Sequence, residues 1–131
     1  MRKLFVVAAL ALAAACGDST SPSSVSGTYN LQTVNGAALP YVFQADNPKR
    51  ELISEQLVLS ANGTFTFNDV IRTTPTGGAP TTMPTTDSGT FTLTGNSIVF
   101  TFGGTSSIAG SVSGSTLTII DTGVTAVYSK Q

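Results

Sequence analysis

Two acidic residues, Glu55 and Asp69, occupy positions where the surrounding strand pattern predicts side chains that face the core. Each continues a run of apolar residues by a step of two, and residues two apart lie on the same face of a strand. If both face inward, they form a polar site with Arg72 or Lys49 as a counter-ion, and paired carboxylates can carry out acid–base catalysis when their separation is suitable. We favour the alternative that each acid lies where its strand leaves the core and faces water. We therefore do not expect an enzyme.

Residue types that several other kinds of site require are missing from the sequence. It contains no histidine, no tryptophan and a single cysteine, Cys16. Serine–histidine and cysteine–histidine nucleophiles are therefore excluded, and neither zinc-ligand spacing nor a phosphate-binding glycine loop occurs. The sequence consequently predicts no catalytic residue, no metal site and no cofactor.

An apolar stretch within residues 37–50 interrupts the strand pattern. Its large side chains could cover a ligand pocket, or they could form an extra strand or a plug that completes the core. We favour the second interpretation because apolar side chains usually pack. Any pocket is expected to be shallow and to lie near this stretch. The candidate ligand-binding residues are Leu39, Tyr41, Phe43, Glu55, Phe65, Asp69 and Phe100.

A second interruption, residues 73–87, is rich in proline and threonine and contains Gly77 and Gly78. Long connections without a core of their own are either functional or mobile. We expect this segment to be a mobile connection between two strands of a hairpin.

From Val25 onward, apolar and polar residues alternate with a period of two between turns that contain Gly, Asn or Asp. This alternation is typical of strands with one buried face. Gly-Thr-aromatic triplets begin at Gly27, Gly63 and Gly89, and in each we expect the glycine in a turn, the threonine facing water and the aromatic ring facing the core. The residues predicted to face inward are Tyr29, Leu31, Ile53, Leu57, Leu59, Phe65, Phe67, Phe91, Leu93, Ile98, Phe100, Phe102, Val112, Leu117, Ile119, Ala126 and Tyr128.

Eight or nine short antiparallel strands joined mostly by tight turns predict an all-β domain over residues 25–131. The expected architecture is a small up-and-down β-barrel, with a β-sandwich as the alternative, and barrel closure would remove the edge strands that promote aggregation. An eight-strand barrel is just wide enough to be filled by side chains or to hold one small ligand. Because the pattern directs seven aromatic rings inward, we expect a mostly filled interior.

The first 15 residues have the layout of an export signal. Arg2 and Lys3 precede a short apolar run, residues 4–12, and three alanines follow at 13–15. The run is shorter than the ~20 residues of a membrane-spanning helix. We therefore expect residues 1–15 to form a signal helix that is removed from the mature protein.

Residues 12–16, Leu-Ala-Ala-Ala-Cys, resemble the lipobox of bacterial lipoproteins. The resemblance implies that Cys16 is the first mature residue, that it carries acyl chains that anchor it to a lipid bilayer, and that residues 16–24 form the lipidated cysteine and a flexible tether. The alternative is an ordinary secretory cleavage that leaves a free thiol. The resemblance implies an exported protein of the bacterial cell envelope and leaves the choice of inner or outer membrane open.

Removal of residues 1–15 leaves four basic and seven acidic residues, a formal charge of −3. Binding of nucleic acid requires clustered lysine and arginine. The charge therefore argues against a nucleic-acid partner.

Residues 27–29, Gly-Thr-Tyr, are similar to the Gly-x-Trp opening of lipocalins, with Tyr29 in place of the tryptophan. The resemblance implies a lipocalin-like barrel that binds a small apolar ligand. The alternative is a ligand-free barrel that acts through its surface, as a structural partner or an inhibitor of an envelope protein.

Overall fold

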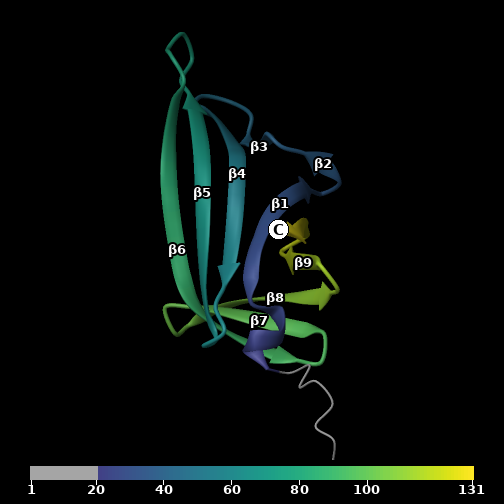
Figure 1. Ribbon diagram of the computed structural model, residues 1–131. Helices are drawn as coiled ribbons and strands as arrows, with labels where there is room; N and C mark the ends of the chain where they lie inside the picture. Colours follow the sequence, from purple (N-terminus) through teal and green to yellow (C-terminus); the bar gives the residue numbers. More distant parts are fainter. Residues whose placement is uncertain (1–20) are drawn as a thin grey trace, which may run out of the picture.

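A computed structural model describes residues 21–131, which form one antiparallel β-sheet preceded by a short 3-10 helix (Figure 1). The predicted signal helix and Cys16 lie outside the described residues. The elements are η1 (Pro22–Val25), β1 (Gly27–Val34), β2 (Ala37–Ala38), β3 (Tyr41–Gln44), β4 (Lys49–Leu59), β5 (Thr64–Thr74), β6 (Thr81–Thr94), β7 (Ser97–Phe102), β8 (Ser106–Ser113), β9 (Thr116–Asp121) and β10 (Val124–Lys130). Within residues 21–131, no helix is both long enough and apolar enough to cross a membrane.

The sheet closes on itself through eight of these strands. From β4 to β10 each strand pairs with the next along the chain, and β10 pairs with β1. The barrel is closed by β1 and β4, whose register runs from Gly27 opposite Leu59 to Asn30 opposite Gln56. The predicted all-β, up-and-down barrel is therefore confirmed, with two additional strands.

The two additional strands lie where β1 and β4 separate. Beyond their shared register, β1 pairs with β2 at Thr33 and Ala38, and β4 pairs with β3 at Tyr41 and Leu52. Residues 37–44 thus form two short strands that line the gap between β1 and β4, and Lys49 and Arg50 already belong to β4. The extra-strand interpretation of this segment is the one that the structure supports.

The two ends of the barrel differ. The closed end carries η1 and the turns at residues 60–63, 95–96 and 114–115. The open end carries the turns at residues 75–80, 103–105 and 122–123, and there β4, β5 and β6 rise past the shorter strands β7–β10 (Figure 1).

Large side chains fill the interior toward the closed end. The ring of Phe65 makes edge-on contacts with three other rings, at centroid distances of 5.1 Å to Phe100, 4.9 Å to Phe102 and 5.4 Å to Phe67. Edge-to-face pairs of this kind are favourable beyond the area that they bury. The buried apolar residues are Val25, Tyr29, Leu31, Val34, Leu57, Leu59, Phe65, Phe67, Phe91, Leu93, Ile98, Phe100, Val112, Leu117, Ile119 and Tyr128.

Helix η1 seals the closed end. Val25 is buried beneath the barrel, and its carbonyl oxygen accepts a 2.7 Å hydrogen bond from the hydroxyl of Tyr29. The ammonium group of Lys130 lies over the Tyr29 ring, 5.8 Å from the ring centroid. The Lys130 side chain passes so close to Gly27 that a Cβ there would lie 2.6 Å from its Cε. The Lys130 side chain is flexible and could move, but the φ of Gly27 is +144°, a backbone conformation that other residues rarely adopt, so glycine is favoured here within β1 and not in a turn.

Residues 73–87, predicted to be a mobile connection, are mostly strand. β5 extends to Thr74, β6 begins at Thr81, and only residues 75–80 lie between them. Threonine is β-branched and favours strands, and Pro84 is tolerated because β6 has a partner on one side only at that position. The prediction of a long loop was wrong because the threonines form paired strand on both sides of residues 75–80 despite the nearby prolines.

The prediction that Ile53 faces inward was also wrong. A β-bulge lies between Leu52 and Ser54, so the residues before it lie on the faces opposite to those that the alternation of residues 55–59 predicts. Leu52 therefore packs against the core, opposite Ile71, in place of Ile53.

In the third Gly-Thr-aromatic triplet, the glycine is needed for a different reason from the one predicted. Gly89 lies within β6, opposite Phe102, and not in a turn. A Cβ at this position would overlap the carbonyl oxygen of Thr101 and lie 3.0 Å from the ring of Phe65. Glycine is required here chiefly because the backbone carbonyl oxygen of Thr101 occupies the space of a Cβ, and the ring of Phe65 lies next to it.

Candidate functional site

Two adjoining cavities occupy the open end of the barrel, with volumes of about 370 Å³ and 340 Å³. The first lies toward β6–β9 and includes Phe67, Phe102, Ile108 and Ile119 in its wall. The second lies under the β2–β3 segment and includes Leu31, Val34, Leu52 and Ile71. Five residues line both cavities: Glu55, Asp69, Val124, Ala126 and Tyr128.

The cavities arise because strand alternation continues past the layer of large rings. At the open end, the inward positions of β10 hold the small residues Ala126 and Val124, and those of β4 and β5 hold Glu55 and Asp69. These side chains are smaller than the rings below them, and β1 and β4 have already separated. Space is therefore left that the protein does not fill.

Glu55 and Asp69 lie directly opposite each other on neighbouring strands. The hydroxyl of Tyr128, on β10, donates a hydrogen bond to Glu55 Oε1 on β4, and β1 pairs with both β10 and β4. Both acids therefore face inward, in the arrangement that we named but did not favour. The floor shared by the two cavities therefore holds the carboxyl groups of Glu55 and Asp69 and the phenol of Tyr128.

Burial changes the protonation of this group. Loss of solvation raises the pKa of Glu55 to about 7, and the nearby charge of Asp69 acts in the same direction, while the hydrogen bond from Tyr128 opposes it. The pKa of Asp69 is also raised, chiefly by burial. The pKa of Tyr128 is raised by burial and by the charge of Glu55, so its hydroxyl keeps its proton at neutral pH.

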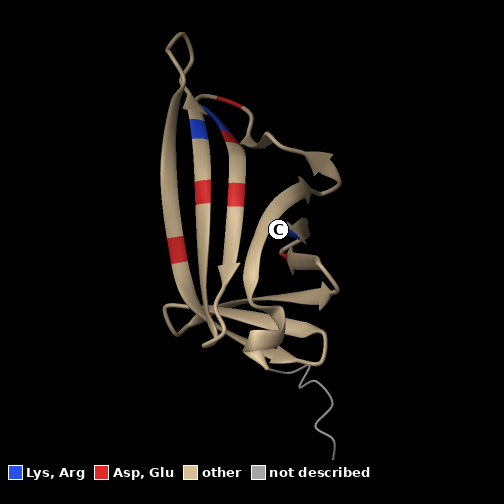
Figure 2. Cartoon of the chain, viewed as in Figure 1, with Lys and Arg blue, Asp and Glu red and all other residues tan. Residues whose placement is uncertain are grey.

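Two more acids lie at the first cavity, Asp87 from β6 and Asp121 from the end of β9. Figure 2 shows the acidic positions along β4, β5 and β6, below the basic position near the top of β5. Neither cavity, as the described part of the chain forms it, is lined by lysine or arginine. The open end is thus apolar with an acidic floor and margin.

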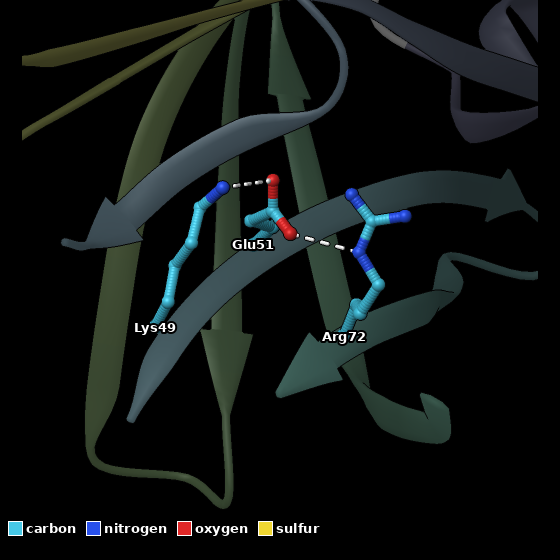
Figure 3. Close-up of polar contacts among 3 residues, drawn as sticks. All are labelled: Lys49, Glu51 and Arg72. Atoms are coloured by element: carbon cyan, nitrogen blue, oxygen red, sulfur yellow. Dashed lines mark hydrogen bonds and ion pairs between the residues drawn. The ribbon is translucent and has the colours of Figure 1, made fainter. Parts of the chain in front are cut away.

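The counter-ions expected for these acids are engaged elsewhere. Arg72 Nε lies 2.8 Å from Glu51 Oε2, and Lys49 Nζ lies 3.2 Å from Glu51 Oε1 (Figure 3). Glu51 is only 5% exposed, and the hydrogen bond from Arg72 is the largest of the effects that lower its pKa. The prediction that Arg72 or Lys49 would pair with Glu55 and Asp69 was therefore wrong, because both point to the opposite face of the sheet.

The remaining predicted residues fall into two groups. Tyr41 and Phe43 from β3 line the second cavity. Leu39 is partly buried against the core, and Phe65 and Phe100 lie in the packed layer toward the closed end. The structure thus brings Tyr41, Phe43, Glu55 and Asp69 together around the cavities.

Sequence reasoning did not assign Tyr128, Ala126 or Val124 to the site. The alternation placed Tyr128 and Ala126 on the inward face, which is correct, but the site also requires barrel closure, which brings β10 and β4 to either side of β1. Glu51 was missed for another reason. It faces outward, and its burial results from the two cations that cover it.

Comparisons with protein-family models, with curated proteins and with solved structures found no match to this chain.

Proposed function

We propose that this protein is an exported bacterial lipoprotein, anchored through acylated Cys16, whose barrel binds a small apolar ligand at its open end. The observation that carries the binding proposal is the pair of adjoining apolar-walled cavities beside Tyr128. Ligand sites are typically concave, largely apolar and provided with a few convergent polar groups. The open end has each of these features, and the barrel interior toward the closed end is filled by side chains.

The position of η1 also supports an orientation of the open end relative to the membrane. Ser21 is the first described residue, directly before η1 at the closed end, and Cys16 lies five positions before it in the sequence. An extended chain reaches about 3.4 Å per residue, so this connection spans at most about 17 Å. An anchor at Cys16 would hold the closed end near the lipid headgroups, and the cavities would open away from the membrane.

Ligand binding is tested by filling the cavities. Ala126→Phe places a ring between them, and Ile120→Phe makes a similar change on the outer face, where Ile120 is 62% exposed. We expect a neutral fluorescent probe such as N-phenyl-1-naphthylamine to bind the wild type and Ile120→Phe, and to lose at least about tenfold in affinity with Ala126→Phe. Equal binding by all three proteins, or by none, would contradict the proposal.

The anchor is tested separately, with the full-length chain expressed in a bacterium that processes lipoproteins. We expect the wild type to enter the detergent phase on phase separation and its mature N-terminal peptide to carry acyl chains by mass spectrometry. Cys16→Ser should move the protein to the aqueous phase. An unmodified cysteine in the mature wild-type protein would disprove the anchor and leave the cavity untouched.

One feature favours the second function, action through the surface. The outer half of the β5–β6 hairpin extends past β7, and residues 81–88 of β6 pair with β5 alone. Met83 on this hairpin is 64% exposed. If no apolar probe binds, replacing residues 71–83 by a two-residue turn and measuring association with the cell-envelope fraction tests this alternative.

A further inference from the structure

The polar groups of the cavities are chiefly carboxyl groups, with the hydroxyls of Tyr41, Thr122 and Tyr128 beside them. Glu55, Asp69, Asp87 and Asp121 bring carboxyl groups to the first cavity, and no lysine, arginine, asparagine or glutamine lines either cavity within residues 21–131. The one strong donor on the floor, the hydroxyl of Tyr128, is already bound to Glu55. A ligand that enters therefore meets acceptors and negative charge.

One of these acceptors has no partner. Across the described chain, Asp69 Oδ1 is the only buried side-chain oxygen or nitrogen for which no hydrogen bond is formed. A buried polar atom left unpaired costs free energy, so nearly all such atoms in folded proteins have a partner. Asp69 lines both cavities, so a donor that occupies either of them can reach its carboxyl group.

Aromatic rings surround the same space. Phe67, Phe102 and Tyr128 line the first cavity, and Tyr41, Phe43 and Tyr128 line the second. The faces of aromatic rings attract cations. Among these rings Phe43 already has a cation beside it, because the guanidinium of Arg50 lies 5.2 Å from its centroid. Lys49 and Arg72 bind Glu51 and are not among the residues that line the cavities.

We propose that the open-end cavities take a cationic amphiphile, an alkyl chain with an ammonium head, and discriminate against fatty acids. This inference rests on the proposed binding function and specifies its ligand class. The alkyl part lies against the apolar wall formed by Val124, Ala126 and Ile71. The ammonium group donates hydrogen bonds to the carboxyl groups of Glu55 and Asp69, and a carboxylate head in the same place would be repelled by them.

The titration of the carboxyl groups on the cavity floor should also make ligand binding depend on pH. The groups that face the bound head are Glu55 from β4, Asp69 from β5, Asp87 from β6, Asp121 from β9 and Tyr128 from β10. An alkyl ammonium, with a pKa of about 10.4 like that of lysine, stays charged below pH 9. Since the pKa of Glu55 is raised to about 7, its carboxyl loses a proton as the pH rises through neutrality, and the negative charge that attracts the ligand increases.

The test compares three ligands that share a ten-carbon chain, namely decylammonium, decanol and decanoate, as competitors of the neutral fluorescent probe on the mature protein. A charge-assisted hydrogen bond is worth about 1.5–3 kcal/mol, so we expect decylammonium to compete at a concentration at least about tenfold lower than decanol, with decanoate weakest. Raising the pH from about 5.5 to about 8.5 should strengthen decylammonium several-fold and leave decanol unchanged.

Substitutions test whether Glu55 and Asp69 cause the preference for decylammonium over decanol. Glu55→Gln and Asp69→Asn should each reduce the advantage of decylammonium over decanol, and Asp46→Asn, which removes the same charge from an exposed loop, should not. Binding of decanol by each variant shows that its cavity is intact. If a variant does not fold, the ranking of the three ligands on the wild type still decides.

The outcomes separate the two proposals. If decanol or decanoate competes as well as decylammonium, the inferred ligand class is wrong and the binding function stands. If none of the three competes and the probe itself does not bind, the binding function fails and the inference fails with it. A preference for decylammonium that persists in both Glu55→Gln and Asp69→Asn would overturn the assignment to these carboxyl groups.

Discussion

The closed and open halves of this barrel are built from the same strands but use their inward positions differently. On β5, the inward residues toward the closed end are Phe65 and Phe67, and the next ones toward the open end are Asp69 and Ile71. On β10 the corresponding change is from Tyr128 to Ala126. One alternating pattern therefore produces both a packed core and a cavity, and the size and charge of the inward side chains decide which of the two forms.

The largest expected effect is the loss of a ring from the closed half. Phe100 is fully buried against Phe65 and Phe67, so Phe100→Ala should lower the free energy of unfolding by about 3–5 kcal/mol. Val124→Ala in the open half, where the side chain is 38% exposed, should cost less than about 1 kcal/mol. Urea denaturation of the two variants measures the difference. Similar losses would mean that the halves are packed alike.

A second effect tests how tightly the rings fill the closed half. Gly89→Ala forces a methyl group against the carbonyl of Thr101 and the ring of Phe65, and should cost about 2–3 kcal/mol. Gly114→Ala, at a φ of +58° with open space around it, should cost only about 1 kcal/mol through backbone strain. Thermal denaturation compares them. A Gly89→Ala protein as stable as the Gly114→Ala protein would show that the packed layer yields easily.

The closed half of the barrel could be predicted from the sequence, and the open half could not. The alternation around Phe65, Phe91 and Phe100 was sufficient to predict the strands and nearly all of the filled interior, because one residue in two must be apolar where one face is buried. Leu52 could not be predicted, since the bulge that turns it inward leaves no mark in the local sequence. The cavities could not be predicted either, because they depend on the separation of β1 from β4.

The acids show the limit of local reasoning most clearly. Glu55 and Asp69 continue an apolar alternation, and the general cost of burying charge favoured an exposed position for both. That cost is met by raised pKa values and by the Tyr128 hydroxyl, which comes from a strand 73 residues away from Glu55 in sequence. Only the closed barrel brings that hydroxyl to the site.

The smallest effect expected in the folded protein alone comes from this acidic floor. Since the pKa of Glu55 is raised from 4.5 to about 7 on folding, the folded state binds a proton more tightly than the unfolded state between these two values. Its contribution is therefore fully present below about pH 4.5 and is lost as the pH rises through 7, and between pH 5 and pH 8.5 the decrease is on the order of 2–3 kcal/mol. Asp69 acts in the same direction. Denaturation measured from pH 5 to pH 8.5 should show the decline, and Glu55→Gln should flatten it; stability that rises with pH would contradict the assignment.

The most direct test of the account uses the absence of tryptophan from the sequence. Val124→Trp places a single fluorophore at the mouth shared by both cavities, and Ile120→Trp places one on the outer face of the neighbouring strand. Titration with decanol should shift the emission of the Val124→Trp protein to shorter wavelength in a saturable manner and leave that of the Ile120→Trp protein unchanged. No shift in either protein, or the same shift in both, would contradict a ligand site at the open end.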